Sequence, residues 1–275
     1  MKKRIEILLL TSALAAFFLP LNSLAITKKQ IKPPFTGFFV GARAGLNTNT
    51  ARQVADSSVT YRVFYGTDVT MNHTNSSVYS HSAAGAISFG YGVDLGKRFN
   101  LITEASVSFQ GNDLNTLDKL TTSDPFDDGF ILDLNNNIKT KLNHAEFDFD
   151  LKPGILISNN TLAFAVIGGA INQMKMTSNS FSKLQDLKNG STFSKTVGFS
   201  AKKTVVGIRA GFGLSSMLTQ KLALNLSYIY TYYGKISGSA MGSFRTNGFT
   251  LPFNTASSSE VHKHTVLVGI NYFFN

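Results

Sequence analysis

Eight stretches of this chain carry apolar side chains at every second position, and the connections between the stretches alternate strictly between long and short. In the last stretch, apolar residues fill one face from Val266 to Phe274, whereas Gly269 and Asn271 lie on the other face. A period of two residues is typical of a β-strand whose two faces have different surroundings. The repetition of this pattern predicts an all-β chain.

The expected strands and connections follow one plan along the chain. Strands are expected over residues 37–47, 80–95, 99–110, 138–157, 161–173, 202–215, 221–233 and 263–275. Long connections are expected over residues 48–79, 111–137, 174–201 and 234–260. Within the first of them Val59, Tyr61, Val63 and Tyr65 alternate, which is compatible with a hairpin extension of the neighbouring strands. A short turn follows the second, fourth and sixth strands, so every long connection falls at the same end of the sheet.

This asymmetry favours a membrane barrel over a soluble sandwich, because a sandwich has no reason to place all its long connections at one end. Outer-membrane barrels have short periplasmic turns and long extracellular loops, and a spanning strand needs ~9–11 residues. We therefore expect an eight-stranded antiparallel up-and-down transmembrane β-barrel with four long extracellular loops and three short periplasmic turns. A barrel of ten strands is the alternative if segments of residues 48–79 pair within the membrane.

The N-terminus has the features of a secretory signal peptide. Lys2, Lys3 and Arg4 precede an apolar run over residues 7–19, which is short for a membrane-spanning helix. Small residues at Ser23 and Ala25 predict cleavage after Ala25. The expected organisation is a signal peptide over residues 1–25, a periplasmic lead-in over residues 26–36 and a barrel over residues 37–275.

The charge balance narrows the classes of partner. Charged residues make up only 15% of the chain, below the ~25% usual for soluble domains. Removing the three basic residues and one acidic residue of the leader leaves 23 basic and 15 acidic residues, a net charge of +8. The basic residues are scattered and the chain is exported, which argues against nucleic acid. We expect outer-membrane lipid and lipopolysaccharide as partners. The chain has no Cys, so no disulfide can stabilise it.

Six charged residues are expected to face the barrel interior. Residues 40–46 and 206–212 both place the pattern Gly-x-Arg-x-Gly on their polar face, which brings Arg43 and Arg209 inside. The acids that share the polar faces of their strands are Glu104, Glu146, Asp148 and Asp150. Eight strands leave an interior just wide enough for side chains to fill. These charges therefore either form a structural network or line a gated ion path, and acid–base catalysis by alternate residues of one strand is disfavoured.

The chain resembles the eight-stranded outer-membrane barrels of the OmpA-like transmembrane and opacity-protein type over its whole mature length. The resemblance rests on the signal peptide, the opening strand of Gly and aromatic residues, residues 152–154 (Lys-Pro-Gly) before a short turn, and the aromatic end of the last strand. It implies that Tyr272 and Phe274 form the signal for the barrel-assembly machinery, although Asn275 follows where the family ends in Phe. No residues remain for a peptidoglycan-binding domain, so that role does not transfer.

Three other groups of residues were considered as sites. His81 and Ser82 are adjacent on a strand and therefore point to opposite faces, which argues against a lipid-deacylating pair. His262 and His264 share one face near the outer end of the last strand, but two His residues without a third ligand are a weak metal site. The acids of the second long connection do not follow the spacing of a calcium loop; they are Asp124, Asp127, Asp128 and Asp133.

The second and third long connections carry opposite charge. Residues 111–139 hold six acids and two bases, and residues 175–203 hold six bases and one acid. We therefore expect these segments to associate above the barrel. The resulting hypothesis is a non-enzymatic outer-membrane surface protein, structural or adhesive to host or surface ligands through its loops, without cofactor or metal. The alternatives are a narrow porin-like channel and, less favoured, a lipid-modifying barrel enzyme.

Overall fold

The computed structural model describes residues 33–63, 66–111, 113–115, 122–126, 130–186, 190–246 and 249–274. Residues 34–275 belong to one compact unit. The expected signal peptide, its cleavage site after Ala25 and Asn275 lie outside the described residues. No described residue belongs to a helix that is long and apolar enough to cross a membrane.

The described residues form eleven β-strands, and all the strand pairs are antiparallel. The strands are β1 (Gly37–Val63), β2 (Gly66–Gly96), β3 (Phe99–Gln110), β4 (Asp113–Asn115), β5 (Thr122–Phe126), β6 (Phe130–Leu142), β7 (Ala145–Leu156), β8 (Thr161–Asp186), β9 (Thr192–Met217), β10 (Leu222–Thr246) and β11 (Phe249–Phe274).

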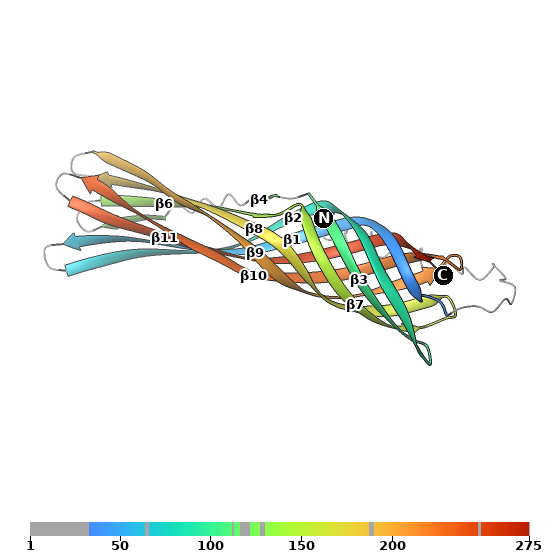
Figure 1. The fold of residues 1–275 in the computed structure, drawn as a ribbon. Coiled ribbons are helices and arrows are strands. Elements are labelled where there is room, and N and C mark those ends of the chain that lie inside the picture. The colour runs from blue at the N-terminus through green and yellow to red at the C-terminus, as the bar shows by residue number, and fades with distance from the viewer. Residues whose placement is uncertain are drawn as a thin grey trace, which may run out of the picture. The chain divides into compact units, whose positions relative to one another are not determined.

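Eight of these strands close into a ring (Figure 1). Neighbours pair in the order β1–β2–β3–β7–β8–β9–β10–β11, and β11 pairs back with β1. This arrangement confirms the eight-stranded antiparallel barrel. Residues 51–63 pair with residues 66–78 beyond the ring rather than adding strands to it, so the ten-stranded alternative is wrong.

The three short turns lie where the sequence predicts them. They occupy residues 97–98, 157–160 and 218–221. Lys97 and Arg98 adopt positive φ angles of 48° and 77°, which a two-residue hairpin requires because its twist must match that of the strands. Gly96, with a φ of 80°, lies at a register shift in the pairing of β2 with β3. In the last turn, the Thr219 hydroxyl accepts a hydrogen bond of 3.0 Å from the amide of Leu222.

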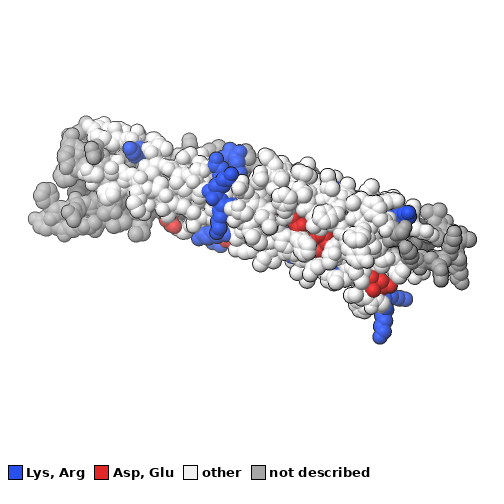
Figure 2. Space-filling view, viewed as in Figure 1, with Lys and Arg blue, Asp and Glu red and all other residues white. Residues whose placement is uncertain are grey.

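Apolar side chains cover the outside of the ring, as the two-residue period predicts. Phe38, Phe147 and Val206 remain 67%, 62% and 71% exposed. The alternation also holds in β8, where Leu162 and its alternate neighbours face inward. Figure 2 shows a narrow band of Lys and Arg across the visible face, with isolated Lys or Arg side chains toward both ends. Large exposed apolar side chains all around a ring are typical of a surface in contact with lipid.

The long connections are mostly ordered β-structure, which corrects the prediction of long loops. Strands β1, β2, β8, β9, β10 and β11 each run for 25 to 31 residues and continue past the apolar band. We call the described residues of 51–78, 122–142, 174–205 and 233–261 the distal extension. Its Ser, Thr and Asn residues resemble loop residues in sequence, but hairpin pairing satisfies their backbone groups.

The fourth expected strand, residues 138–157, is interrupted at residues 143–144. β7 pairs with β8 from Phe147 to Leu156, and β6 then takes over the same edge of β8. Thus β6, from the second long connection, pairs with residues 174–186 of the third. The two oppositely charged segments do associate, and the described contact is a backbone ladder.

The distal extension is a stack of two sheets, β2–β1–β11–β10 and β5–β6–β8–β9. Small hydroxyl side chains meet between the sheets. The Ser178 and Ser257 hydroxyls lie 2.9 Å apart, and those of Ser180 and Thr255 lie 2.8 Å apart. Gln53 of β1 also donates a hydrogen bond of 3.2 Å to Thr140 of β6. These contacts join strands that are not neighbours in either sheet.

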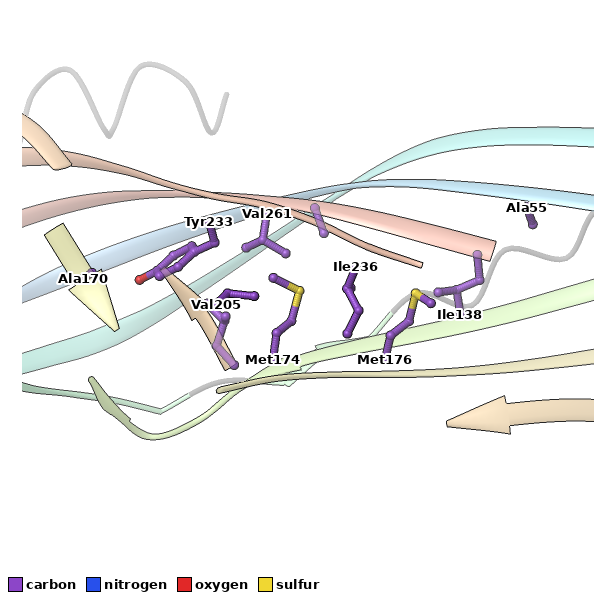
Figure 3. Close-up of a cluster of buried hydrophobic side chains, with 11 residues drawn as sticks. Ala55, Ile138, Ala170, Met174, Met176, Val205, Tyr233, Ile236 and Val261 are labelled. Carbon is purple, nitrogen blue, oxygen red and sulfur yellow. The ribbon is translucent and has the colours of Figure 1, made fainter. Parts of the chain in front are cut away.

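Two apolar clusters lie inside the strands. The cluster near the short turns contains Phe35, Phe39, Ile102, Leu162, Phe164, Val166, Ala223 and Phe273. The other cluster lies at the base of the distal extension (Figure 3) and contains Ala51, Ala55, Ile138, Leu142, Ala170, Met174, Met176, Val205, Tyr233, Ile236 and Val261. Its side chains come from both sheets and fill the space between them.

Amide hydrogen exchange tests this description of the distal extension. Residues 174–185 of β8 pair with strands on both sides, so all their amides should exchange slowly. In the described part of the chain, residues 66–83 of β2 pair with β1 alone, so every second amide there should exchange quickly. Equally fast exchange over both segments would contradict the two-sheet stack. The ring residues of β2 serve as the slow control.

Candidate functional site

The interior of the ring holds a balanced set of charges. Among the described residues, eight charged side chains are buried, four acidic and four basic. They are Arg43, Glu104, Glu146, Asp148, Asp150, Lys152, Arg209 and Lys263. Buried charges are stable only when they are paired and hydrogen-bonded, and a set with zero net charge allows that pairing.

One cluster is centred on Glu104 of β3. Its carboxylate forms an ion pair with Arg43 of β1 and accepts a hydrogen bond from the guanidinium. The Lys152 ammonium of β7 lies 2.6 Å from the same carboxylate. The Arg43 guanidinium also donates to the Ser88 hydroxyl over 3.3 Å. Glu104 therefore links β1, β3 and β7 across the interior, and Arg43 extends the network to Ser88 of β2.

A second cluster is centred on Arg209 of β9. Its guanidinium forms an ion pair with Asp148 and lies 3.1 Å from Asp150 and 3.5 Å from Glu146. The three acids alternate along β7, so all of them point inward. Lys263 of β11 lies 2.5 Å from Glu146, which connects this cluster to the opposite side of the ring.

Glu146 also gathers two neutral donors. The buried Tyr233 hydroxyl of β10 donates a hydrogen bond to its carboxylate. The Asn172 side-chain amide of β8 donates another over 3.0 Å. With Lys263 and Arg209, these contacts satisfy both oxygens of the buried acid, which lowers the cost of removing it from water.

Glycines on neighbouring strands make room for both arginines. Gly269 lies opposite Arg43 in the ladder, and Gly168 lies opposite both Asp150 and Arg209. A Cβ atom at Gly168 would collide with the Asp150 side chain and the Phe149 carbonyl. The eight-stranded interior therefore accommodates long charged side chains only where the facing residue has none.

The structure brings the six sequence-selected charges together and adds three residues that the sequence analysis did not select. Lys152 was detectable, because it continues the alternation of Glu146, Asp148 and Asp150. Lys263 is in phase with Gly269, and Tyr233 is in phase with the inward residues of β10, so the two-residue period also predicts that both side chains face inward. The period does not predict that both contact Glu146, since Lys263 and Glu146 are 117 residues apart in the chain.

The charged layer lies between apolar layers. The Phe-rich cluster lies toward the short turns, and the Met-containing cluster of Figure 3 lies toward the distal extension. A cavity beside Arg209 and Lys263 measures about 10 Å³, which is room for one water molecule at most. The arrangement can fix the charged side chains in place, but it leaves little space for a hydrated ion.

The three candidate histidines lie on the outer surface. The imidazole of the exposed His81 is hydrogen-bonded to Thr48 over 3.0 Å, and Ser82 faces the other way. His262 and His264 face outward and contact the hydroxyls of Tyr230 and Tyr228 at 2.5 and 2.7 Å.

The acids of the second long connection cannot be assigned a site. Asp127 and Asp128 lie outside the described residues, and the side chains of Asp124 and Asp133 are not among those described. Within the described part of the chain, no group of three or more His, Cys, Asp or Glu residues could hold a metal ion.

Adjacent glycines of β8 provide a matched test of how tightly the interior is packed. Gly168→Ala should lower the free energy of unfolding by about 1–3 kcal/mol, because the added methyl group overpacks the interior. Gly169→Ala should be nearly neutral, since the nearest heavy atom to its Cβ would be 3.7 Å away. Urea unfolding in lipid vesicles measures both values. Equal stability of the two variants would contradict the tight packing around Arg209.

Known proteins were compared with the chain by sequence and by structure. The sequence model of the outer membrane protein beta-barrel domain family matches residues 11–274. No curated protein matches the sequence. Among solved structures, Neisserial surface protein A is 12% identical, with 87% of this chain and 98% of that chain covered and a TM-score of 0.34. OprG from Pseudomonas aeruginosa is 12% identical, with 88% and 98% covered and a TM-score of 0.39. The attachment invasion locus protein Ail of Yersinia pestis is 10% identical, with 79% and 98% covered and a TM-score of 0.24.

Proposed function

The chain belongs to the outer membrane protein beta-barrel domain family, and on this premise we propose that it is a non-enzymatic surface protein that contacts host or other surface ligands through its distal extension. The family places the protein in the outer membrane, with the apolar outer surface of the ring in contact with lipid. The strands of such a barrel have their long connections on the extracellular side, so the distal extension faces the exterior.

The order of the distal extension is the observation that carries this proposal. Strands bonded side by side and joined by buried hydroxyl contacts form a pre-organised surface, which loses little conformational entropy on binding. Large apolar side chains stand on this surface beyond the lipid-facing band: Phe181 is 41% exposed and Met241 is 80% exposed. Aromatic and Met side chains are enriched at the core of protein interfaces.

Shortening three hairpins tests the proposal. In each hairpin, the residues between a pair of facing residues are replaced by a tight turn, so that the barrel and its interior remain. The facing pairs are Ser57 with Asn72, Ser178 with Phe199, and Gly238 with Ser257. Bacteria displaying the full or the shortened protein at equal surface levels are compared for adhesion to host cells and matrix proteins. We expect adhesion to fall at least tenfold, because the binding surface is removed.

Variants shortened at one hairpin each then locate the contact. Adhesion that is unchanged after all three cuts, or that is absent in the full protein, would contradict the proposal for the ligands tested. A barrel that no longer reaches the surface is recognised by its surface level and is excluded from the comparison.

We propose that the interior charges are structural and hold the ring in shape, rather than lining a channel. Three features support this role: the equal numbers of buried acids and bases, the apolar layers on both sides of them, and the small cavity beside Arg209. Hydrophobic constrictions oppose the passage of ions. Removing one partner from a buried ion pair costs ~3–5 kcal/mol, since it leaves the other charge unpaired.

Planar bilayer recordings separate this role from the porin-like alternative. The purified protein should produce no conductance steps, because the layers above and below the charges are closed to hydrated ions. Arg43→Ala should destabilise the barrel, because the buried Glu104 carboxylate loses one of its two cationic partners and the Ser88 hydroxyl loses a donor. Conductance in the unmodified protein that changes with Arg43→Ala or Arg209→Ala would instead establish a pore.

Export and assembly complete the proposal. The leader over residues 1–25 would direct secretion, and residues 26–36 would precede the barrel. Tyr272 and Phe274 of β11 would be read by the barrel-assembly machinery. Their rings lie 5.3 Å apart and both face outward, where a partner can reach them before the ring closes.

A further inference from the structure

Three lysines lie in register across neighbouring strands at the base of the distal extension. Lys175 of β8 lies directly opposite Lys141 of β6 on one side and Lys202 of β9 on the other. Lys175 and Lys202 are exposed. We call these three residues the lysine row. Figure 2 shows a narrow band of Lys and Arg across the visible face, with a few acidic atoms beside its lower end.

Like charges that lie directly opposite each other destabilise a sheet. Asp113 of β4 lies opposite Lys141 in the ladder, so the row has an acid at one end. In the described part of the chain, Lys175 and Lys202 have no ion-pair partner. The fold therefore holds two exposed positive charges side by side without an internal anion to compensate them.

The position of the row identifies where a compensating anion would come from. Lys175 lies four residues beyond Ile171, an exposed apolar residue of β8, and Lys202 lies four residues beyond Val206 of β9. Four residues of a tilted strand rise about 10 Å along the membrane normal. The headgroup region extends about 5–8 Å beyond the hydrocarbon core, and a Lys side chain can extend back toward it.

We infer that the lysine row binds the phosphate groups of the outer-leaflet glycolipid, with Lys175 and Lys202 as the principal contacts. Two adjacent ammonium groups at headgroup height can share one phosphate or bind two neighbouring phosphates on a single lipid. The apolar surface immediately below, at Ile171 and Val206, contacts the acyl chains of the same molecule. This lipid site is independent of the proposed ligand contacts of the distal extension.

The test compares three probes on the purified full-length barrel in detergent micelles. The probes are bisphosphorylated lipid A, the same lipid after enzymatic removal of its phosphates, and inorganic phosphate. The lipid retained per barrel after gel filtration is measured over a concentration series. The variants are Lys175→Gln/Lys202→Gln, the charge-conserving Lys175→Arg/Lys202→Arg, and Lys183→Gln/Lys195→Gln. The last pair removes the same charge from the same two strands, further from the membrane.

Each lysine near an anionic lipid surface contributes a factor of about five in affinity. The Gln pair at the row should therefore need roughly twenty- to thirtyfold more lipid A for half-occupancy. Removing the phosphates should weaken binding to the unmodified protein by a similar factor. The Arg pair and the distal Gln pair should bind as the unmodified protein does. If the double variant does not fold, Lys175→Gln alone should show about a fivefold loss.

Three results would overturn the inference. One is equal retention of lipid A by the unmodified protein and by the Gln pair at the row. Another is displacement of lipid A by inorganic phosphate at matched concentration, which would indicate a site for free phosphate. The third is aggregation of the Gln pair with lipid A retention unchanged, because the lysines would then only protect the edge of β9 from pairing with another chain.

Discussion

The backbone ladder between β8 and β9 closes the ring, and the rest of the structure depends on that closure. Lipid offers no partner for an amide or a carbonyl group, and each unsatisfied group costs several kcal/mol. Once β8 pairs with β9, every strand in the apolar band has a neighbour on both edges. The outer surface can then be wholly apolar, and polar residues are confined to the alternate positions that face inward.

Closure with eight strands also sets the width of the interior, and the interior residues follow from that width. The space is filled by side chains, so a long residue needs a small one opposite: Arg43 faces Gly269, and Arg209 faces Gly168. Charges placed there are out of reach of bulk water and must compensate one another, which the equal numbers of buried acids and bases achieve. The same packing supports the structural role proposed for these charges.

Beyond the lipid the constraint of closure ends, and the strands rearrange. β9 and β10 stop pairing after Ile208 and Tyr232, and β6 replaces β7 on the edge of β8. Two sheets then face each other, close enough for hydroxyl groups to meet because the side chains between them are small. The lysine row lies at this transition, where the surface changes from lipid-facing to water-facing, and the ordered strands beyond it provide the surface proposed for ligand binding.

The sequence by itself determined which face each residue occupies, because a two-residue period assigns inward and outward positions before any strand finds its partner. That period was sufficient to place Arg43 inside the barrel. The alternation of long and short connections predicted eight strands but left ten as an alternative, which the pairing of residues 51–63 with residues 66–78 beyond the ring then excluded. Only the tertiary structure decided that Lys263 meets Glu146 and that the long connections continue as paired strands. The physical reason is that contacts across a closed ring depend on the register between strands, which no single strand encodes. A segment rich in Ser and Thr, moreover, can form either a loop or the interior of two stacked sheets, so its composition does not predict which of the two it forms.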